Sequence, residues 1–435
     1  MGRTDMAALN SMTRRGFLKT AGVTAVPFIL PTRLRGVDAP ANRVTLACIG
    51  VGSMGMEDLK GFLFTPGVQI AAVCDVDAGR RDAAKAFVEK HYAEQKTAGT
   101  WQGCAAYTDL RECLARDDID AVCIATADHW HVLAALLAVR AGKDVYCEKP
   151  LSVTVAEGRV LSDAVRRYGR VFILGSQQRS EGRFRFASEL VLNGRIGQVR
   201  QVKVGLNKGQ AHDPVQPMPV PPGLDYDLWL GPAPFRPYHK DCLHYNFRFI
   251  SDFSGGQMLN WGSHHLDIAQ WGLGTDRSGP VEVRATGVFP GDGPYDNPVT
   301  FVADYLYANG VTLNCSTANP SGVRWEGSAG WIAVDRGRLA AEPASLLKSV
   351  LRPDEIHLVE SRSHKDHFIE CIRTRAETVA PCEVGHRSAS MGHIGNIAML
   401  LQRPLRWDPA VERFTDDDEA NRLLGRARRG PWSLG

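Results

Sequence analysis

The chain has 435 residues, too many for one ordinary domain, and its 44% hydrophobic and 23% charged residues are typical of a soluble globular protein. The formal net charge is +3, and the first 41 residues carry this basic excess with six Lys or Arg against two Asp or Glu. The remainder is close to neutral, which argues against a nucleic-acid partner. The ten cysteines show no C-x-x-C spacing, so neither a metal site nor a disulfide framework is predicted.

Residues 1–41 have the pattern of a targeting segment. Arg14 and Arg15 precede Phe17-Leu18-Lys19, and a mostly apolar run over residues 20–30 follows. This run is too short to span a bilayer, and the paired arginines resemble the twin-arginine export signal of bacteria. We therefore expect a periplasmic or otherwise exported mature protein without an integral membrane segment. The alternative is a basic leader with no role.

A strand, a glycine-rich turn and a helix open the next domain. The apolar run 44–49 leads into Gly50-Val51-Gly52-Ser53-Met54-Gly55, which matches G-x-G-x-x-G. Such glycines permit a tight turn, close approach of a pyrophosphate, and packing of helix on strand, while the helix N-terminus attracts phosphate. The pattern predicts that residues 50–55, including Gly50, Gly52, Ser53, Met54 and Gly55, bind a dinucleotide.

A second apolar run over residues 68–74 ends at Asp75, twenty residues after Gly55. A carboxylate at this spacing accepts hydrogen bonds from the adenosine ribose hydroxyls and repels a 2′-phosphate, which favours NAD over NADP. Arg80 and Arg81 follow within two turns and keep NADP open as an alternative. The structural alternative for Asp75 is a solvated loop acid.

Strands and helices alternate up to residue 177, which predicts parallel strands with right-handed crossovers. Thr126, His131, Glu148 and Lys149 lie at or just past the ends of predicted strands. Ligands of such sheets bind beyond the strand C-termini, so these four residues are candidate cofactor contacts. For His131, helix N-terminal capping or packing is the alternative, and for Lys149 the alternative is a surface lysine that caps a strand.

These motifs together resemble those of the Gfo/Idh/MocA oxidoreductase family. The residues that carry the resemblance are the glycine turn, Thr126 with His131, and the tripeptide Glu148-Lys149-Pro150. The resemblance implies that Lys149 reaches both the nicotinamide ribose and the substrate hydroxyl. It also implies a cis peptide bond before Pro150, which would aim Lys149 inward.

The expected fold is α/β. An N-terminal Rossmann domain with a doubly wound parallel sheet spans residues 42–177. An α+β substrate domain with an open, mainly antiparallel sheet spans 178–408, and residues 409–435 form a C-terminal arm. Asn309-Gly310 predicts a hairpin in the second sheet. The outer face of that sheet is the expected contact of a homo-oligomer.

Candidate substrate contacts lie in the second domain. Gln178 follows the last strand of the first domain, and aromatic residues cluster around Tyr226 and Arg248. Aromatic faces stack on the C–H surfaces of sugars, which would make a sugar platform. Ordinary packing with an exposed arginine is the alternative for these aromatic stretches.

The second candidate catalytic stretch is a helix expected to run from Gly255-Gly256 to Trp271. Asn260 and His264 are four residues apart and share a helix face, while His265 points about a quarter turn away and is a candidate substrate contact. In the resembled family this helix carries an aspartate and a histidine four residues on, which assist the lysine. His264 matches the histidine, whereas Asn260 departs from the aspartate and cannot take a proton. A core position for His264 and a helix N-cap role for Asn260 are the alternatives.

The sequence therefore predicts an oxidoreductase that transfers hydride between a secondary alcohol of a sugar, polyol or glycoside and a tightly held NAD, with Lys149, His264 and Asn260 as the catalytic group. One alternative is a redox-assisted glycosidase that oxidises, eliminates and hydrates its substrate without net redox change. The other is a catalytically impaired protein that binds sugar and cofactor, to which Asn260 lends support.

Overall fold

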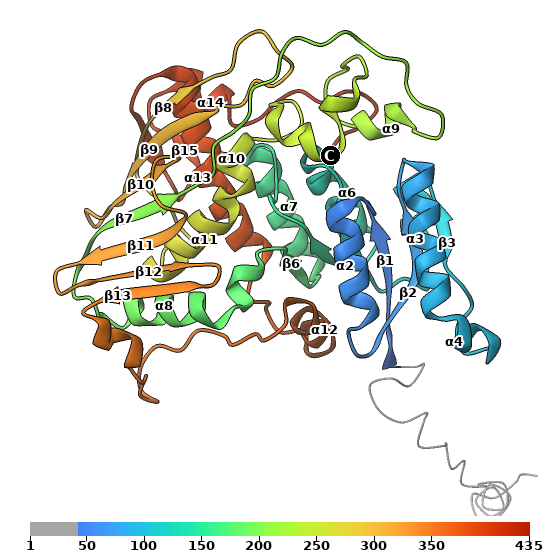
Figure 1. Ribbon diagram of the computed structural model, residues 1–435, viewed down its shortest axis with the longest axis horizontal. Helices are drawn as coiled ribbons and strands as arrows, with labels where there is room; N and C mark the ends of the chain where they lie inside the picture. Colours follow the sequence, from blue (N-terminus) through green and yellow to red (C-terminus); the bar gives the residue numbers. More distant parts are fainter. Residues whose placement is uncertain (1–41) are drawn as a thin grey trace, which may run out of the picture. The chain divides into compact units, whose positions relative to one another are not determined.

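The computed structural model describes residues 42–435. The predicted leader, with Arg14 and Arg15, lies outside the described residues. Two β-sheets organise the described part of the chain, and Figure 1 shows them with helices between them. Among residues 42–435, no helix combines the length and apolar character needed to cross a bilayer.

The first sheet has six parallel strands in the order β3-β2-β1-β4-β5-β6. Its strands are β1 (Val44–Ile49), β2 (Val68–Cys74), β3 (Ala105–Tyr107), β4 (Ala121–Ile124), β5 (Asp144–Cys147) and β6 (Phe172–Leu174). Its helices are α2 (Ser53–Leu63), α3 (Ala78–His91), α4 (Ala93–Thr97), α5 (Leu110–Leu114), α6 (Asp128–Arg140) and α7 (Val155–Tyr168). The order reverses between β1 and β4, which opens a ligand crevice at their C-terminal ends and confirms the predicted doubly wound fold.

Two local features place the candidate residues at this crevice. Helix α6 begins at Asp128, so His131 lies in its first turn. The Lys149–Pro150 peptide bond is cis, as the family resemblance implied.

The second sheet has nine strands in the order β13-β12-β11-β7-β10-β9-β8-β14-β15. They are β7 (Val199–Gly205), β8 (Glu282–Val288), β9 (Thr300–Leu306), β10 (Thr312–Ser316), β11 (Gly322–Gly327), β12 (Trp331–Asp335), β13 (Arg338–Glu342), β14 (Leu405–Asp408) and β15 (Arg413–Phe414). All neighbours are antiparallel except β7 and β10, which confirms the mainly antiparallel sheet. The turn at Asn309-Gly310 joins β9 to β10, as predicted.

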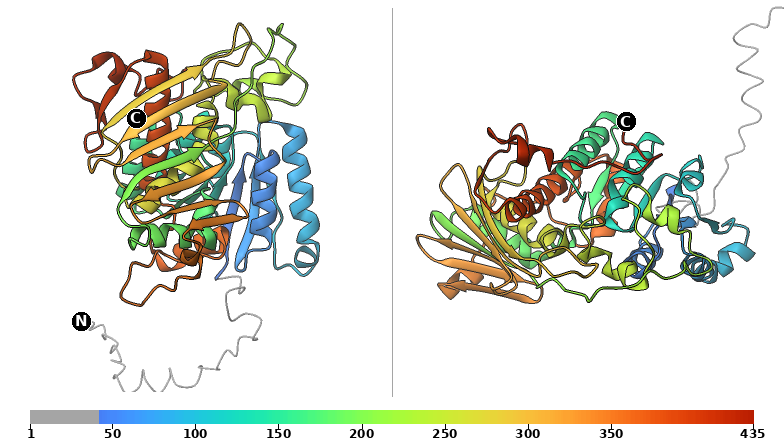
Figure 2. Two further views of the ribbon diagram at one scale, coloured as in Figure 1. Left: turned by 60° about the vertical axis from the view of Figure 1, so that its left-hand side comes forward. Right: turned by 90° about the horizontal axis from the view of Figure 1, so that it is seen from above.

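One face of the second sheet is covered by helices, and Figure 2 shows that they lie on that side only. These helices are α8 (Gly182–Leu192), α11 (Gly262–Leu273) and α13 (Cys382–Leu401). Along β9, Tyr305 points inward and is buried, whereas its neighbours Asp304 and Leu306 are exposed. This alternation is typical of a sheet with one covered face. Association of two chains through the uncovered face stays a prediction.

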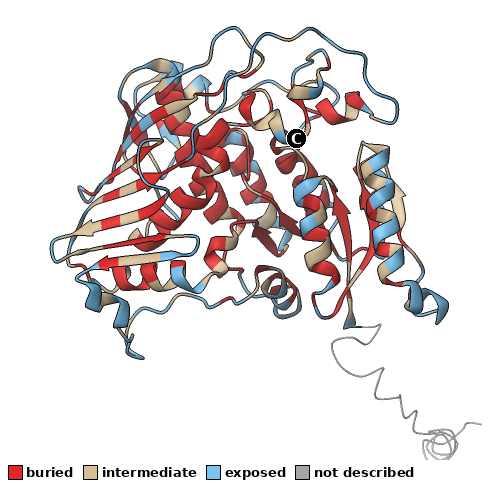
Figure 3. Cartoon of the chain, in the orientation of Figure 1, coloured by how far each residue is buried: buried red, intermediate tan, exposed pale blue. Residues whose placement is uncertain are grey.

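The segment between the two sheets holds short elements above the crevice. They are α9 (Tyr226–Leu230), η4 (Lys240–Cys242), η5 (His244–Phe249) and α10 (Gly256–Asn260). The predicted single helix from Gly255 to Trp271 is wrong in one respect, because Trp261 separates α10 from α11. Figure 3 shows that α10 and α11 are almost wholly buried, so this break lies in the interior between the sheets.

The C-terminal part of the chain returns to the first domain. Helix α12 (His364–Thr374) places Phe368 and Ile369 in the apolar core beneath the first sheet. Helices α12 and α13 are the two longest helices of this part of the chain. The short helix α14 (Asp418–Arg422) is capped by Asp417, whose carboxylate accepts a hydrogen bond from Ala420 N.

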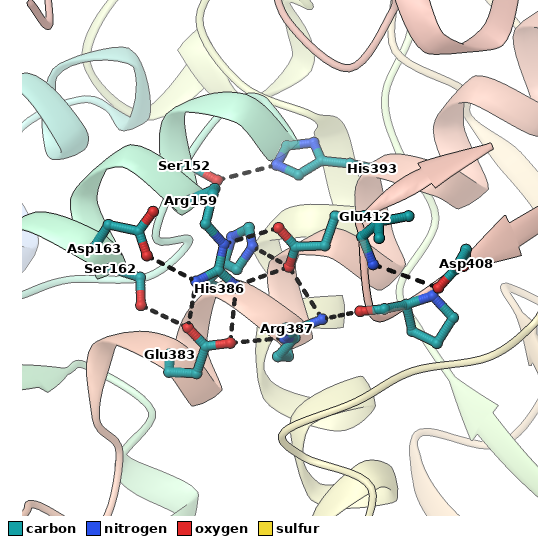
Figure 4. A network of polar contacts seen from close by, with 12 residues as sticks. Ser152, Arg159, Ser162, Asp163, Glu383, His386, Arg387, His393, Asp408 and Glu412 are labelled. Atoms are coloured by element: carbon teal, nitrogen blue, oxygen red, sulfur yellow. Dashed lines mark hydrogen bonds and ion pairs between the residues drawn. The ribbon is translucent and has the colours of Figure 1, made fainter. Parts of the chain in front are cut away.

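A polar network fastens α7 to α13 and to the loop before β15 (Figure 4). Arg159 on α7 donates to both carboxylate oxygens of Glu383 on α13 and to both of Glu412. Although burial raises the pKa of Glu412, hydrogen bonds from Arg159 and His386 outweigh it and lower that pKa to about 2. These carboxylates are therefore ionised at neutral pH and hold the two lobes together.

A second ion pair between the lobes is more deeply buried. Arg179 in η3 (Gln177–Ser180), just after β6, donates to Asp267 on α11 at 2.7 and 2.9 Å and to Asp276 at 3.1 Å. Ser388 donates to the same Asp267 carboxylate. The side chains of Arg179 and Asp267 are only 3% and 2% exposed, so neither finds water as a substitute partner.

Replacing Arg179 with alanine should lower the free energy of unfolding by about 3–5 kcal/mol, because it leaves the Asp267 carboxylate buried without its charge partner. Urea denaturation followed by tryptophan fluorescence measures this loss. The matched control is Arg277→Ala, which breaks an exposed pair with Glu377 and should cost less than about 1 kcal/mol. Equal effects of the two substitutions would contradict the assigned role of the buried pair.

Candidate active site

A cavity of about 650 Å³ extends from the glycine turn to Lys149. The first domain supplies its floor, and segments 228–229 and 244–248 with Asn260 line it from the second. Of the residues predicted to bind cofactor, the lining includes Gly50, Gly52, Ser53, Met54, Asp75, Thr126, His131, Glu148 and Lys149. The cavity therefore joins the predicted nucleotide contacts to the predicted catalytic lysine.

The glycine turn has the close packing that its sequence predicted. Gly50 has a φ of 78°, and a Cβ on it would lie 2.7 Å from the backbone carbon of Ala125. A Cβ on Gly55 would lie 1.9 Å from the carbonyl oxygen of Gly50, so the third glycine serves packing and does not line the cavity. No side chain caps α2, whose first N–H groups follow directly on Gly52 at the cavity wall.

Two further observations fit a bound dinucleotide. The Thr126 hydroxyl is buried at the cavity wall without a hydrogen-bond partner among the described residues. The uncapped N-terminus of α2 offers donors and the positive end of a helix dipole to phosphate. The N–H groups of α2 can therefore bind the phosphates of a nucleotide, and the Thr126 hydroxyl can bind one of its polar groups.

Asp75, the predicted ribose contact, lines the cavity, and its carboxylate also supports the turn. Its two oxygens accept hydrogen bonds from Val51 N at 2.8 Å and from Asp77 N at 2.9 Å. Burial raises the pKa of Asp75, while these backbone donors and Arg80 oppose the rise. Arg80 lies over the turn: its Nη1 is 2.6 Å from the position of a Cβ on Gly52. A guanidinium at that place can contact phosphate oxygens.

Lys149 contacts the second lobe at the far end of the cavity. Its Nζ donates to Asn260 Oδ1 at 2.8 Å and lies 3.4 Å from the Asn260 carbonyl oxygen. Burial lowers the pKa of Lys149, the carboxylates of Glu148 and Asp128 raise it, and the positive charges of Arg248 and Arg336 lower it again. A lysine whose pKa is lowered can act as a base nearer to neutral pH.

The turn that carries Lys149 is fixed from both sides. His131 faces the Pro150 carbonyl with Nδ1 at 2.7 Å and the Thr126 carbonyl with Nε2 at 3.1 Å, so it ties the cis turn to the end of β4. Glu148 accepts a hydrogen bond from Gln177 at 2.7 Å, and burial raises its pKa to about 8. Both ring nitrogens of His131 face protein carbonyls, so the side chain can hold the turn in place. The ring also lines the cavity.

Asp128 and Arg248 bring opposite charges close to Lys149. Asp128 in the first turn of α6 lines the cavity and accepts a hydrogen bond from Ser254. Burial raises the pKa of Asp128, and the positive charges of His131, Lys149 and Arg248 oppose this. The sequence analysis did not select Asp128, although an acid in the first helical turn after a parallel strand was an available signal. Arg248 lines the cavity and stacks on Tyr245, 3.6 Å from the ring centroid.

His264 lies one helical turn beyond Asn260 and is 4% exposed. It is not part of the cavity lining, and its Nδ1 has no hydrogen-bond partner among the described residues. Burial lowers the pKa of His264 well below its usual value, and the charges of Lys149 and Arg336 lower it further. The ring is therefore neutral. The residue in direct contact with Lys149 is Asn260, and proton transfer by His264 stays a prediction.

Three predicted substrate contacts lie outside the cavity. Tyr226 packs on Trp229 in an aromatic cluster, and its hydroxyl donates to the Arg236 carbonyl. His265 is fully buried with Nδ1 2.9 Å from the Gly205 carbonyl, because the break at Trp261 turns it toward the second sheet. Gln178 is buried, and neither its amide oxygen nor its nitrogen has a partner among the described residues. Of the four predicted substrate contacts, only Arg248 lines the cavity.

Two family models match this chain and cover both lobes. Residues 44–176 match the NAD-binding Rossmann fold of the Gfo/Idh/MocA oxidoreductases, and residues 200–434, more than half the chain, match their C-terminal α/β domain. The chain belongs to the Gfo/Idh/MocA oxidoreductase family. Its first domain is therefore the NAD-binding domain of an oxidoreductase, and the cavity along the glycine turn is its nucleotide site.

Other members differ in name and in how much of the chain they match. The uncharacterized oxidoreductase YrbE of Bacillus subtilis is 24% identical over 82% of this chain and 94% of its own length. A glycosyl hydrolase family 109 protein of Saccharopolyspora erythraea is 37% identical over 35% of this chain and 36% of its own. Inositol 2-dehydrogenase of Salmonella typhimurium is 30% identical over 34% of this chain and 42% of its own length. The last two matches span well under half of those relatives.

Solved structures of family members share the two-lobed fold. Aldose–aldose oxidoreductase of Caulobacter crescentus, solved with glycerol, superposes with a TM-score of 0.59 and 20% identity over 84% of this chain and 99% of that one. Scyllo-inositol dehydrogenase of Lactobacillus casei, solved with NAD(H) and scyllo-inositol, superposes with a TM-score of 0.58 and 16% identity. The match covers 84% of this chain and 99% of that one. At such identities the likeness supports the fold alone.

Replacing Asn260 with aspartate should move the acidic limb of the kcat/KM–pH profile to higher pH by about one unit or more. A carboxylate 2.8 Å from Nζ favours the charged ammonium and so raises the pKa of Lys149. A base works in its deprotonated form, so activity near neutral pH should fall and recover at higher pH. The pH dependence of oxidoreductase turnover measures the shift.

The control for this substitution is Asn309→Asp in the β9–β10 turn, which adds the same charge at the opposite end of the second sheet. Its pH profile should match that of the unmodified protein. An unchanged limb in Asn260→Asp would contradict titration of Lys149 as the controlling ionisation.

Proposed function

We propose that this protein oxidises a secondary alcohol of a sugar, polyol or glycoside, or reduces the matching ketone, with a tightly held nicotinamide cofactor. The observation that carries the proposal is the contact of Lys149 with Asn260, both of which line the cavity. Membership of an oxidoreductase family and an NAD-binding domain support it. The inositol and aldose enzymes among the similar proteins suggest the substrate class.

The proposed base is the neutral amine of Lys149. A neutral amine has two N–H bonds and one lone pair, and the two N–H bonds can donate to the Asn260 side-chain and backbone oxygens. The lone pair is then free to accept the proton of a substrate hydroxyl in the cavity. The bound nicotinamide supplies the hydride acceptor. Asn260 thus orients the lysine without charging it, which makes the family departure at this position compatible with catalysis.

Asp128 and Glu148 complete the proposed proton chemistry. Both are buried near Lys149, and burial raises the pKa of each. A carboxyl group with a raised pKa near neutral pH can exchange a proton with the lysine after each turnover. Glu148 is the better placed of the two by sequence, since its backbone precedes Lys149 and its carboxylate accepts from Lys149 N.

The strap over the cavity supports retention of the cofactor. Residues 223–225 pair with the loop after β2 through hydrogen bonds from Ala78 N to Gly223 O at 2.8 Å and from Asp225 N to Val76 O at 2.9 Å. This strap comes from the second domain and joins the first beside Asp75, so it must move for a nucleotide to leave. We expect NAD as the nucleotide because the Asp75 carboxylate repels a 2′-phosphate, with NADP as the alternative that Arg80 allows.

Lys149→Ala should lower kcat for sugar oxidation by about 10²–10⁴-fold and leave the bound nucleotide in place, because it removes the base but none of the glycine-turn contacts. Mass spectrometry of the purified protein identifies the nucleotide, and the same method detects keto products after incubation with a panel of sugars and glycosides. The control Lys348→Ala alters an exposed lysine remote from the cavity and should change neither quantity. Full turnover by Lys149→Ala would sink the proposed role.

A redox-assisted glycosidase is the second candidate. The match to a glycosyl hydrolase family 109 protein over 35% of this chain favours it. Oxidation of a glycoside at C3 would acidify the proton at C2, and Lys149 could then assist elimination before water adds. The same panel separates the two functions: release of aglycone without accumulation of NADH supports the glycosidase, and a keto product supports the oxidoreductase.

The twin-arginine pattern supports export as a folded protein. A strap that holds the nucleotide suits a protein loaded with its cofactor before it leaves the cytoplasm. Lys substitution at both Arg14 and Arg15 should retain the protein in the cytoplasmic fraction, since the export receptor reads this pair. Cell fractionation with an antibody measures the distribution, and substitution of Arg33 and Arg35 by Lys is the matched control. Unchanged export would contradict the signal.

A further inference from the structure

Arg336 lies beside the proposed substrate site because of the register of the second sheet. Gly205 at the end of β7 pairs with Gly322, and Val323 pairs with Val334. The β12–β13 turn, which follows Val334, therefore lies at the same sheet end as Gly205, the residue that His265 contacts. This register brings Arg336 to the break between α10 and α11, a placement that its position in the sequence does not suggest.

The Arg336 guanidinium stacks on Trp261 with 4.9 Å between its central carbon and the ring centroid. Trp261 directly follows Asn260, the contact of Lys149, and its ring centroid is 5.9 Å from that of His264. Arg336 is exposed, so the cation faces solvent. Stacking on an aromatic ring fixes the plane of the guanidinium and leaves its N–H donors at the edge.

Arg336 has no acidic partner within 4 Å among residues 42–435. The neighbouring Asp335 accepts from the Arg336 backbone N–H and lies 3.7 Å from His265, so its carboxylate is directed away from the guanidinium. Arg248, on the cavity side of Lys149, is likewise without an ion pair in the described chain, and its Nε lacks a hydrogen-bond partner there. Two unpaired arginines thus flank one lysine.

The charges around the site are therefore predominantly positive where a substrate would enter. The positive charges of Arg248 and Arg336 both lower the pKa of Lys149, after the larger effect of burial and against Glu148 and Asp128. The carboxyl groups of Asp128 and Glu148 also line the cavity, but burial raises the pKa of each, so they offset the positive charges less than ionised carboxylates would. Unpaired cations with water-accessible donors favour an anionic ligand.

We propose that the substrate is an acidic sugar, whose carboxylate or phosphate is bound by Arg336 while its secondary hydroxyl faces Lys149. This inference rests on the proposed oxidoreductase function and narrows its substrate class. Arg248 assists from the cavity side. The planar guanidinium binds two oxygens of such a group in parallel, which also fixes which hydroxyl reaches the lysine.

The cofactor phosphates do not explain Arg336. The phosphate-binding turn carries its own cation, Arg80, which lies against Gly52 at the other end of the cavity. Arg336 is not among the residues that line the nucleotide cavity, whereas Arg248 is. Substitution of Arg336 therefore tests binding of a substrate anion separately from binding of the cofactor phosphates.

The test is binding of sodium glucuronate, glucose 6-phosphate and glucose to the cofactor-loaded protein by isothermal titration at constant ionic strength. We expect at least one of the two anions to bind more tightly than glucose. The substitution Arg336→Gln should lower the affinity for that anion by about tenfold or more. Arg336→Gln should leave the affinity for glucose unchanged. The matched control is Arg338→Gln, an exposed arginine on the same hairpin, which should alter none of the three.

Comparison of glucuronate with glucose 6-phosphate shows whether a carboxylate or a phosphate is recognised. The inference is supported if the affinity for either anion depends on Arg336. Equal affinities for glucose and both anions, no binding of either anion, or anion binding that survives Arg336→Gln would overturn it. Thermal melting checks that the exposed substitution leaves the fold intact. Failure of the proposed function would give a different result. If an anion binds through Arg336 but yields no keto product and no reduced nucleotide, the inference on anion binding holds and the proposed oxidoreductase function is rejected.

Discussion

The hydrogen bond from Lys149 Nζ to Asn260 Oδ1, 2.8 Å long, is the contact on which the site depends. It joins the end of a parallel strand in the nucleotide-binding lobe to a helix in the other lobe. An amide acceptor orients the amine but adds no charge, so the pKa of Lys149 is set by burial, which lowers it, and by the nearby charges of Glu148, Asp128, Arg248 and Arg336. A carboxylate in the same place would hold the lysine as an ammonium ion.

This contact requires the two lobes to stay in register to within a fraction of an ångström. The buried pair of Arg179 with Asp267 fixes α11 against the end of β6, and the network around Arg159 fixes α13 against α7. His131 and Gln177 fix the turn of Lys149 from within the first lobe. Rigid supports of this kind let a single hydrogen bond define the geometry of a reacting group.

Electrostatics then separates the two ends of the cavity. At the glycine turn, uncapped backbone N–H groups and Arg80 suit the phosphates of a nucleotide. At the lysine, the positive charges of Arg248 and Arg336 lower the pKa of Lys149 and oppose the carboxyl groups of Glu148 and Asp128. The same cations that would attract an acidic sugar also favour the neutral lysine that would deprotonate it, so recognition and base strength are coupled.

Short-range spacing along one strand–turn–helix unit is enough to predict the parallel fold, the glycine turn and the strand ends at Asp75 and Lys149, and local turn chemistry is enough to predict the hairpin at Asn309-Gly310. The break at Trp261 between α10 and α11 could not be predicted, because it arises when the lobes pack together. For the same reason the sequence did not indicate that Tyr226 and His265 lie outside the cavity lining, and contact of either with substrate stays a prediction. The position of Arg336, 187 residues beyond Lys149 in the chain, depends on sheet register, which brings a distant turn to Trp261 and which no local pattern records.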